Sequence, residues 1–183
     1  RSPRASACDP TAAEGRVKAA AFEYTRARDV GEAVRALAEA KGEAKIIAGG
    51  QSLGPMLNLR LVQPDLLIDI TAIGDLKQAD ARKDALFIGS CVTHADIEDG
   101  RVPDVTNGAL PSVASGIAYR AVRNRGTIGG SLVHADPSAD WISALSGLGA
   151  VAVISGGKET RRIPVEKFIV GVFETQLADG EML

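Results

Sequence analysis

The sequence predicts an α+β fold in two lobes. Its first third alternates short apolar strand patterns with one helical pattern, which is typical of a small strand–helix–strand unit. Beyond about residue 76 the apolar runs become short and are separated by tight turns, which indicates hairpins and short helices. The chain has 183 residues, of which 45% are apolar, and this is sufficient for a globular core.

The first lobe is expected over residues 18–75. Asp29 stands where an N-cap belongs, and the apolar residues after it recur at helical spacing up to Gly42, a candidate C′ residue. Short continuous apolar runs indicate buried strands. The predicted elements, in chain order, are a strand at 21–24, a helix at 30–41, a strand at 45–48, a short helix at 53–57 and a strand at 66–70.

The second lobe is expected over residues 76–183, joined to the first near 71–76. Asp136 followed by Pro137 suggests an N-cap with proline at the first helical position. Gly156-Gly157, flanked by residues 151–155 and 158–163, is a hairpin signal. The predicted elements are a hairpin at 76–81 and 85–89, a helix from Thr93, a helix at 109–118, a glycine-rich turn at 126–130, a helix from Asp136 to Leu145 and a hairpin at 151–155 and 158–163.

Composition excludes several classes of protein. The formal net charge is −2, which argues against a dedicated binder of nucleic acid or of a membrane surface. No apolar run approaches the roughly 20 residues of a membrane span, so membrane insertion is not expected. Two cysteines and two histidines are too few for a disulfide framework or a zinc site, so no metal ligands are predicted. Residues 1–17 lack any periodicity and are interpreted as a flexible extension, or alternatively as an arm that packs on a partner.

Two glycine motifs are the candidate binding elements. The first, at residues 49–52, follows a buried strand, and the second runs from Arg125 to Ser131. Glycines allow backbone N–H groups to approach an anion, so two such turns suit the two phosphates of one dinucleotide. Either motif alone is weak evidence, because most glycine pairs are ordinary turns. The GTIG segment at 126–129, with arginines beside it, also matches the GXXG loop of RNA-binding KH domains.

No residues suggest acid–base or nucleophilic catalysis. We find no nucleophile paired with a base and no cysteine pattern for an iron–sulfur cluster, so no catalytic residues are predicted and a cofactor would carry the reactivity. His94 follows a candidate helix cap and is expected at the surface. Trp141 is expected in the core, and Cys91 is expected as a small core residue.

Taken together, three segments carry a resemblance to a known family. They are AGGQSL at 48–53, RNRGTIGGS at 123–131 and HADPSAD at 134–140. In order and spacing they resemble the FAD-binding subunit of molybdenum hydroxylases, the relatives of xanthine dehydrogenase and carbon monoxide dehydrogenase. The resemblance runs from about residue 18 to residue 183. It implies a two-subdomain FAD-binding domain of the vanillyl-alcohol oxidase/MurB type, with FAD extended in the cleft between the subdomains.

The resemblance also implies which residues contact FAD. The backbone of 48–52 would surround the pyrophosphate, the second motif would contact phosphate and ribityl, and Asp140 would bind the ribose or adenine. Ile117 and Leu183 fall where relatives place apolar or aromatic residues near the isoalloxazine ring. The full set is Ile47, Ala48, Gly49, Gly50, Gln51, Ser52, Leu53, Ile117, Thr127, Ile128, Gly129, Gly130, Ser131, Asp140 and Leu183. Valine at Gly50 or at Gly129 is predicted to abolish FAD binding while leaving the fold intact.

The implied function is electron transfer within a complex. By resemblance, an iron–sulfur small subunit with [2Fe–2S] clusters would pass electrons to FAD from a molybdopterin large subunit, and FAD would reduce NAD⁺ or another acceptor. The complex would be cytoplasmic, with a dimer of heterotrimers as one arrangement. A nucleic-acid-binding module that uses the GXXG loop, or a structural subunit without flavin, are the alternatives.

Two departures from the family pattern affect these expectations. Ser131 replaces the Asn or Asp that often follows the paired glycines. The sequence stops where the family continues into a further C-terminal domain. Weak retention of FAD and self-association are therefore expected for this chain alone.

Overall fold

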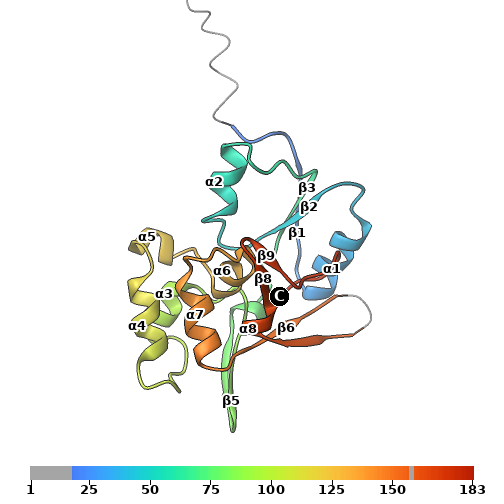
Figure 1. Cartoon of the computed structure of the whole chain (residues 1–183). Coiled ribbons are helices and arrows are strands. Elements are labelled where there is room, and N and C mark those ends of the chain that lie inside the picture. The colour runs from blue at the N-terminus through green and yellow to red at the C-terminus, as the bar shows by residue number, and fades with distance from the viewer. Residues whose placement is uncertain (1–17, 157–158) are drawn as a thin grey trace, which may run out of the picture.

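The computed structural model describes residues 18–156 and 159–183, and the extension predicted for residues 1–17 lies outside this part (Figure 1). The first lobe contains a three-stranded parallel sheet in the order β1–β3–β2. Its elements are β1 (Glu23–Arg26), α1 (Val30–Glu39), β2 (Ala44–Ile47), α2 (Leu53–Asn58) and β3 (Leu66–Asp69). The α1 helix provides the crossover that parallel strands require.

Local sequence signals explain most of this lobe. The Asp29 side chain accepts a hydrogen bond from the Glu32 N–H at 2.7 Å and so caps α1. Ile68 lies in the central strand and is fully buried with Ala33 of α1. Gly42 is not the left-handed C′ residue that the sequence suggested. Its missing side chain instead leaves room for Asp65, whose carboxylate accepts from the Glu43 N–H.

The second lobe is built from antiparallel hairpins and short helices around one core. Its hairpins pair β4 with β5, β6 with β7, and β8 with β9. Trp141 and Phe168 are the largest side chains of the buried cluster. The elements are η2 (Asp75–Lys77), β4 (Ala79–Arg82), β5 (Ala85–Ile88), α3 (His94–Glu98), α4 (Ala109–Gly116), α5 (Arg120–Arg123), α6 (Ile128–His134), α7 (Asp140–Gly147), β6 (Val151–Ile154), β7 (Arg161–Pro164), α8 (Val165–Phe168), β8 (Ile169–Gly171) and β9 (Glu174–Thr175).

Several predictions for this lobe need correction. Residues 128–134 form α6, so most of the predicted glycine-rich turn is the first turn of a helix. The helix expected from Asp136 begins at Asp140, because the Asp136 carboxylate accepts from the N–H and hydroxyl of Ser138 in a local turn. The short elements α5, α8, β8 and β9 were not predicted. Gly157 of the predicted Gly156-Gly157 turn lies outside the described residues.

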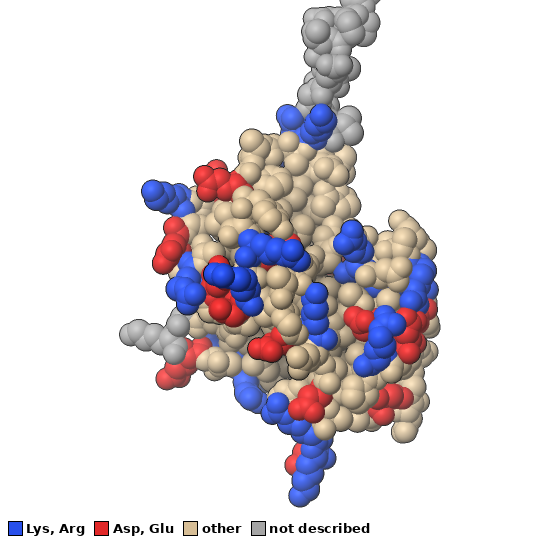
Figure 2. All heavy atoms as spheres, turned by 180° about the vertical axis from the view of Figure 1, so that it is seen from behind, with Lys and Arg blue, Asp and Glu red and all other residues tan. Residues whose placement is uncertain are grey.

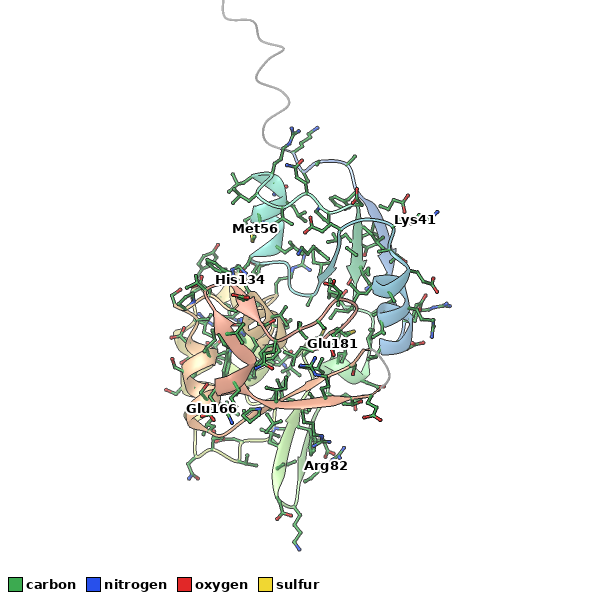
Figure 3. All side chains as sticks on the ribbon, turned by 45° about the vertical axis from the view of Figure 1, so that its right-hand side comes forward. Lys41, Met56, Arg82, His134, Glu166 and Glu181 are labelled. Atoms are coloured by element: carbon green, nitrogen blue, oxygen red, sulfur yellow. The ribbon has the colours of Figure 1, made fainter. Side chains whose placement is uncertain are left out.

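The chain's last residues connect the two lobes. We call residues 178–183 the C-terminal strap. Met182 exchanges two backbone hydrogen bonds of 2.7 Å with Ser155, and its side chain joins the buried cluster of the first lobe. Glu181 pairs with Arg161 at 2.8 Å, while Leu183 packs against the core of the second lobe. Figure 3 shows Glu181 in the middle of the molecule, where the lobes meet.

Charges are mixed over the surface. Figure 2 shows Lys and Arg interspersed with Asp and Glu on the face it displays. Among the residues that the structure describes, none of the helices combines the length and the hydropathy that a membrane crossing requires.

Candidate functional site

The first glycine motif forms a turn between β2 and α2. We call residues Gly49–Leu53 the first turn. Gly50 has φ +68°, a left-handed conformation that glycine adopts without steric cost. The Gly50 carbonyl accepts from the Gly54 N–H at 2.9 Å, so the chain enters α2 directly from the turn. The turn is therefore short, and its conformation depends on Gly50.

The first turn presents unbonded backbone donors. Within the described part of the chain, none of the N–H groups of residues 49–53 donates a hydrogen bond, and the Gln51 amide bonds only to the Gly49 carbonyl at 3.2 Å. These donors are open to solvent, because Gln51 and Ser52 are exposed and the rest of the turn is half-buried. Successive N–H groups of this kind form a concave site for an anion. The first turn can therefore bind a phosphate through its backbone.

The second glycine motif uses its donors internally. We call residues Arg125–Thr127 the second turn; α6 follows it immediately. The Ile128 and Gly129 N–H groups donate to the carbonyls of Val92 and Ser90, both at 3.0 Å, and the Gly130 N–H donates to Thr127 Oγ1 at 3.1 Å. Thr127 pairs with Thr93 in an isolated β-bridge, and in the described residues its own N–H has no acceptor. This motif thus offers an anion one backbone donor rather than a row of them.

Close packing explains the glycines of the second motif. A Cβ at Gly129 would lie 2.7 Å from the Ser90 backbone oxygen, and a Cβ at Gly126 would lie 2.7 Å from His94 Nε2. Gly130 would meet the Thr127 hydroxyl at 2.8 Å. The prediction that valine at Gly129 leaves the fold intact is therefore wrong, because the side chain would collide with backbone atoms of the fold itself.

The two turns contact each other directly. A Cβ at Gly49 would overlap the backbone carbonyl of Arg125, and the Gly126 Cα would lie 2.9 Å from it. The backbones of the two lobes therefore approach each other where the two glycine motifs meet. Gly49 is required for this approach.

A buried histidine supports the second turn. His94, expected at the surface, is only 5% exposed, because its ring lies behind Gly126. Its Nδ1 accepts a hydrogen bond from the Trp141 indole N–H at 3.0 Å. Burial, with a smaller effect from the charge of Arg123, lowers the pKa of His94 to about 4. The imidazole is therefore neutral near pH 7. Trp141 lies in the core, as predicted.

Two of the three arginines beside the GXXG segment, Arg120 and Arg123, are paired within the chain. Arg123 makes hydrogen bonds of 2.8 and 3.0 Å to the two carboxylate oxygens of Glu98. Arg120 pairs with Glu98 and Asp99 at 2.9 and 2.6 Å. The GXXG loop is itself hydrogen-bonded to residues 90–94. These contacts engage most of the loop and two of its three arginines within the protein, which weakens the nucleic-acid interpretation.

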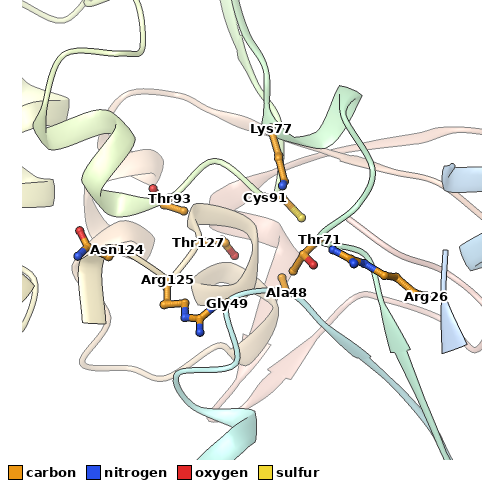
Figure 4. Close-up of a pocket in the computed structure, with 10 residues that line it drawn as sticks. All are labelled: Arg26, Ala48, Gly49, Thr71, Lys77, Cys91, Thr93, Asn124, Arg125 and Thr127. Atoms are coloured by element: carbon orange, nitrogen blue, oxygen red, sulfur yellow. The ribbon is translucent and has the colours of Figure 1, made fainter. Parts of the chain in front are cut away.

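A cavity of about 250 Å³ opens beside both turns (Figure 4). Ala48 and Gly49 contribute from the first turn and its lead-in, and Thr127 contributes from the second. Three basic residues reach the cavity from different elements: Arg26 at the end of β1, Lys77 at the end of η2, and Arg125 in the second turn. The two turns thus share a cavity with basic walls.

The rest of the lining is uncharged. It consists of Thr71, Cys91, Thr93 and Asn124. Burial raises the pKa of the Cys91 thiol to about 11, so the thiol is protonated at neutral pH. Among the described residues, no carboxylate belongs to the lining of this cavity. The site is therefore suited to a negatively charged ligand.

The structure brings together only some of the residues in the predicted contact set. Residues 47–53 and Thr127 lie around the cavity and the adjoining turn. Ile128 and Gly129 are buried in the second lobe, and Gly130 and Ser131 lie in the first turn of α6. Ile117 and Leu183 pack against the core of the second lobe, and Asp140 is exposed at the start of α7.

The predicted contact set contains none of the cavity residues Arg26, Lys77 and Thr71. None of them belongs to a recognisable motif. Their only signal is position, because each stands at or just beyond the end of a strand or short helix. The ends of parallel strands meet at one edge of a sheet, and ligands commonly bind there.

Comparisons with known proteins agree on one family. The family model described as "FAD binding domain in molybdopterin dehydrogenase" matches residues 20–183. The chain is 36% identical to the 6-hydroxypseudooxynicotine dehydrogenase complex subunit alpha of Paenarthrobacter nicotinovorans, over 91% of this chain and 56% of that protein. It is 34% identical to the caffeine dehydrogenase subunit beta of Pseudomonas sp. (strain CBB1), over 91% of this chain and 57% of that protein.

Solved structures give the same result. Quinoline 2-oxidoreductase from Pseudomonas putida 86 superimposes with a TM-score of 0.86 at 37% identity, over 90% of this chain and 57% of that one. Carbon monoxide dehydrogenase from Hydrogenophaga pseudoflava gives a TM-score of 0.84 at 35% identity, over 90% of this chain and 57% of that one. The chain therefore spans a little over half the length of these relatives.

Proposed function

The chain belongs to the family of FAD-binding domains of molybdopterin dehydrogenases, and from this premise we propose that it is the FAD-binding part of an electron-transfer subunit in such an enzyme. The matched family covers nearly all of the described residues. The relatives named above are subunits of dehydrogenases that act on organic compounds. An oxidoreductase role within a larger complex follows by analogy with them.

One observation supports the proposal most directly: the row of N–H groups from Gly49 to Leu53. Within the described residues these donors have no acceptor, and the first of them, at Gly49, lies in the lining of a cavity with basic walls. FAD carries a diphosphate with two negative charges, and backbone donors of this kind are a common way to bind such a group. The residues present therefore fit the cofactor that the family binds.

We extend the proposal to the individual contacts. Residues 48–52 surround the diphosphate, with Ile47 and Leu53 on either side, and Thr127 contributes its free N–H. The other residues of the predicted set, which are Ile117, Ile128, Gly129, Gly130, Ser131, Asp140 and Leu183, line the remaining length of the cofactor or support it. The lobes at 18–75 and 76–183 then correspond to the two subdomains of the vanillyl-alcohol oxidase/MurB layout.

The protein's part in the mechanism is to bind FAD and to hold it in position. When bound, FAD supplies an electron carrier between the [2Fe–2S] clusters of a small subunit and NAD⁺ or another acceptor. Those clusters receive their electrons from a molybdopterin large subunit. The first turn donates hydrogen bonds to the phosphates. The second turn is fixed in place by its bonds to residues 90–94 and by the neutral ring of His94. Since the turns contact each other, both lobes hold the same part of the ligand.

A binding measurement tests the proposal. Purified chain is titrated into FAD, FMN and riboflavin, and quenching of flavin fluorescence gives a Kd for each. We expect FAD to bind at least about tenfold more tightly than riboflavin, because riboflavin lacks the phosphates that the first turn would bind. Equal affinity for FAD and riboflavin would show that the diphosphate site is misplaced. Absence of binding to all three flavins would overturn the proposed function.

A further inference from the structure

The basic residues of the cavity come from three separate elements. Arg26 ends β1, Lys77 ends η2, and Arg125 lies in the second turn. Together they include residues from both lobes. Like charges that converge on one cavity repel each other, and an anion bound among them would offset this repulsion.

Ion pairing distinguishes Lys77 and Arg125 from the paired arginines Arg123 and Arg161. Arg123 and Arg161 each make two short hydrogen bonds to one carboxylate. By contrast, among the described residues neither Lys77 nor Arg125 lies within 4.0 Å of a carboxylate oxygen. Their charges are not balanced by the protein.

Arg26 is only partly balanced. Its one ion pair is with Asp69, at 3.7 Å. The Asp69 carboxylate also accepts hydrogen bonds from the Tyr24 hydroxyl at 2.5 Å and from the Thr71 N–H at 2.7 Å. The Arg26 contact with Asp69 is too long for a hydrogen bond, so the guanidinium keeps its N–H donors for a ligand in the cavity.

The size of the cavity limits what enters it. Sites that enclose a whole small-molecule ligand usually measure about 300–1,000 Å³. At about 250 Å³, this cavity accommodates one part of a dinucleotide rather than the whole. Because its lining is basic and contains no carboxylate, that part must be anionic.

We propose that Arg26, Lys77 and Arg125 form the electrostatic wall of a diphosphate subsite, opposite the backbone donors of the first turn. The inference rests on the proposed function, since FAD would supply the diphosphate. The inference also extends the proposed function, because neither glycine motif includes Arg26 or Lys77. Free inorganic pyrophosphate has the same chemistry and would occupy the same subsite when FAD is absent.

Charge-removing variants test the inference. The variants are Arg26→Gln, Lys77→Gln and Arg125→Gln, all at exposed positions where the fold does not depend on the side chain. Lys83→Gln in the β4–β5 turn and Arg162→Gln on β7 are the matched controls, since both are exposed and lie outside the cavity lining. Kd for FAD is measured by fluorescence quenching at several salt concentrations, and Kd for inorganic pyrophosphate by calorimetry. Unchanged melting temperatures confirm that each variant is folded.

We expect each cavity variant to weaken FAD and pyrophosphate binding about tenfold, with a smaller dependence of Kd on salt. The control variants should change Kd less than twofold. If the wild type binds FAD and the cavity variants bind it equally well, the inference fails and the proposed function stands. If the wild type binds pyrophosphate but not FAD, and the variants lose pyrophosphate, the subsite is correct and the proposed function fails. Binding of neither ligand overturns both.

Discussion

The first turn and the second motif both contain paired glycines with a serine one or two residues further on, yet their backbones are used differently. In the described residues the N–H groups of 49–53 bond to nothing, whereas those of residues 128–131 bond to the chain itself. Gly50 is needed for its left-handed φ, while Gly126 and Gly129 are needed because other residues occupy the space of a side chain. Paired glycines therefore indicate ligand access in one place and close packing in the other.

The largest expected effect comes from Gly129→Val. Its side chain would collide with the backbone of Ser90, and neither backbone segment can move without breaking the bonds that join them. We expect a loss of about 3 kcal/mol or more in the free energy of unfolding, measured by urea denaturation.

The control for this variant is Gly54→Ala, in α2 next to the first turn. A Cβ there has no neighbour within 4 Å, so stability should be unchanged or slightly increased. A Gly129→Val protein with wild-type stability would contradict the packing explanation and would return this glycine to the ligand site.

Acid should weaken the second motif through His94. The pKa of His94 is about 4 in the folded protein and 6.5 in the unfolded chain, so between these values the unfolded chain binds more protons. Stability conferred by the neutral ring is therefore fully present above pH 6.5 and is lost as pH falls towards 4. The loss has an upper limit of about 3 kcal/mol.

The measurement compares wild type with His94→Asn at pH 7 and pH 4.5, using the fluorescence of Trp141, the only tryptophan of the chain. Asparagine keeps an acceptor for the indole N–H but does not titrate in this range. Wild type should lose more stability in acid than the variant. Identical losses would show that His94 is not responsible.

The smallest effect is expected at Gly50. Gly50→Ala forces alanine to adopt φ +68° and should cost about 1 kcal/mol, because an added Cβ meets only the Ile47 side chain, at 3.3 Å. Gly50→Asn should cost less, since asparagine tolerates this conformation. Thermal unfolding of both variants provides the measurement. Equal costs for Ala and Asn would indicate a steric rather than a conformational requirement.

Continuous apolar runs and caps predicted much of the fold. β3 was predicted to within one residue because Leu66–Ile70 is one buried run, and α1 because Asp29 is a strong cap. The α6 helix was missed because two adjacent glycines disfavour a helix. Tertiary hydrogen bonds from residues 90 and 92 outweigh that preference.

The candidate site was predictable only where a motif marks it. The first turn could be identified because glycines follow a buried strand. The burial of His94 could not be predicted from the sequence, because its partner Trp141 is far along the chain and only the tertiary structure brings them together. Arg26 and Lys77 are ordinary charged residues locally, and their role depends on long-range convergence.

The C-terminal strap has a consequence for how the protein is made. Met182 completes the buried cluster that contains Ala33 and Ile68 of the first lobe. During synthesis the strands and helix of that lobe leave the ribosome long before Met182 does. Contacts between distant parts of a chain form slowly. The first lobe therefore lacks part of its buried cluster until the strap has been synthesised, and its apolar surface stays exposed during that interval.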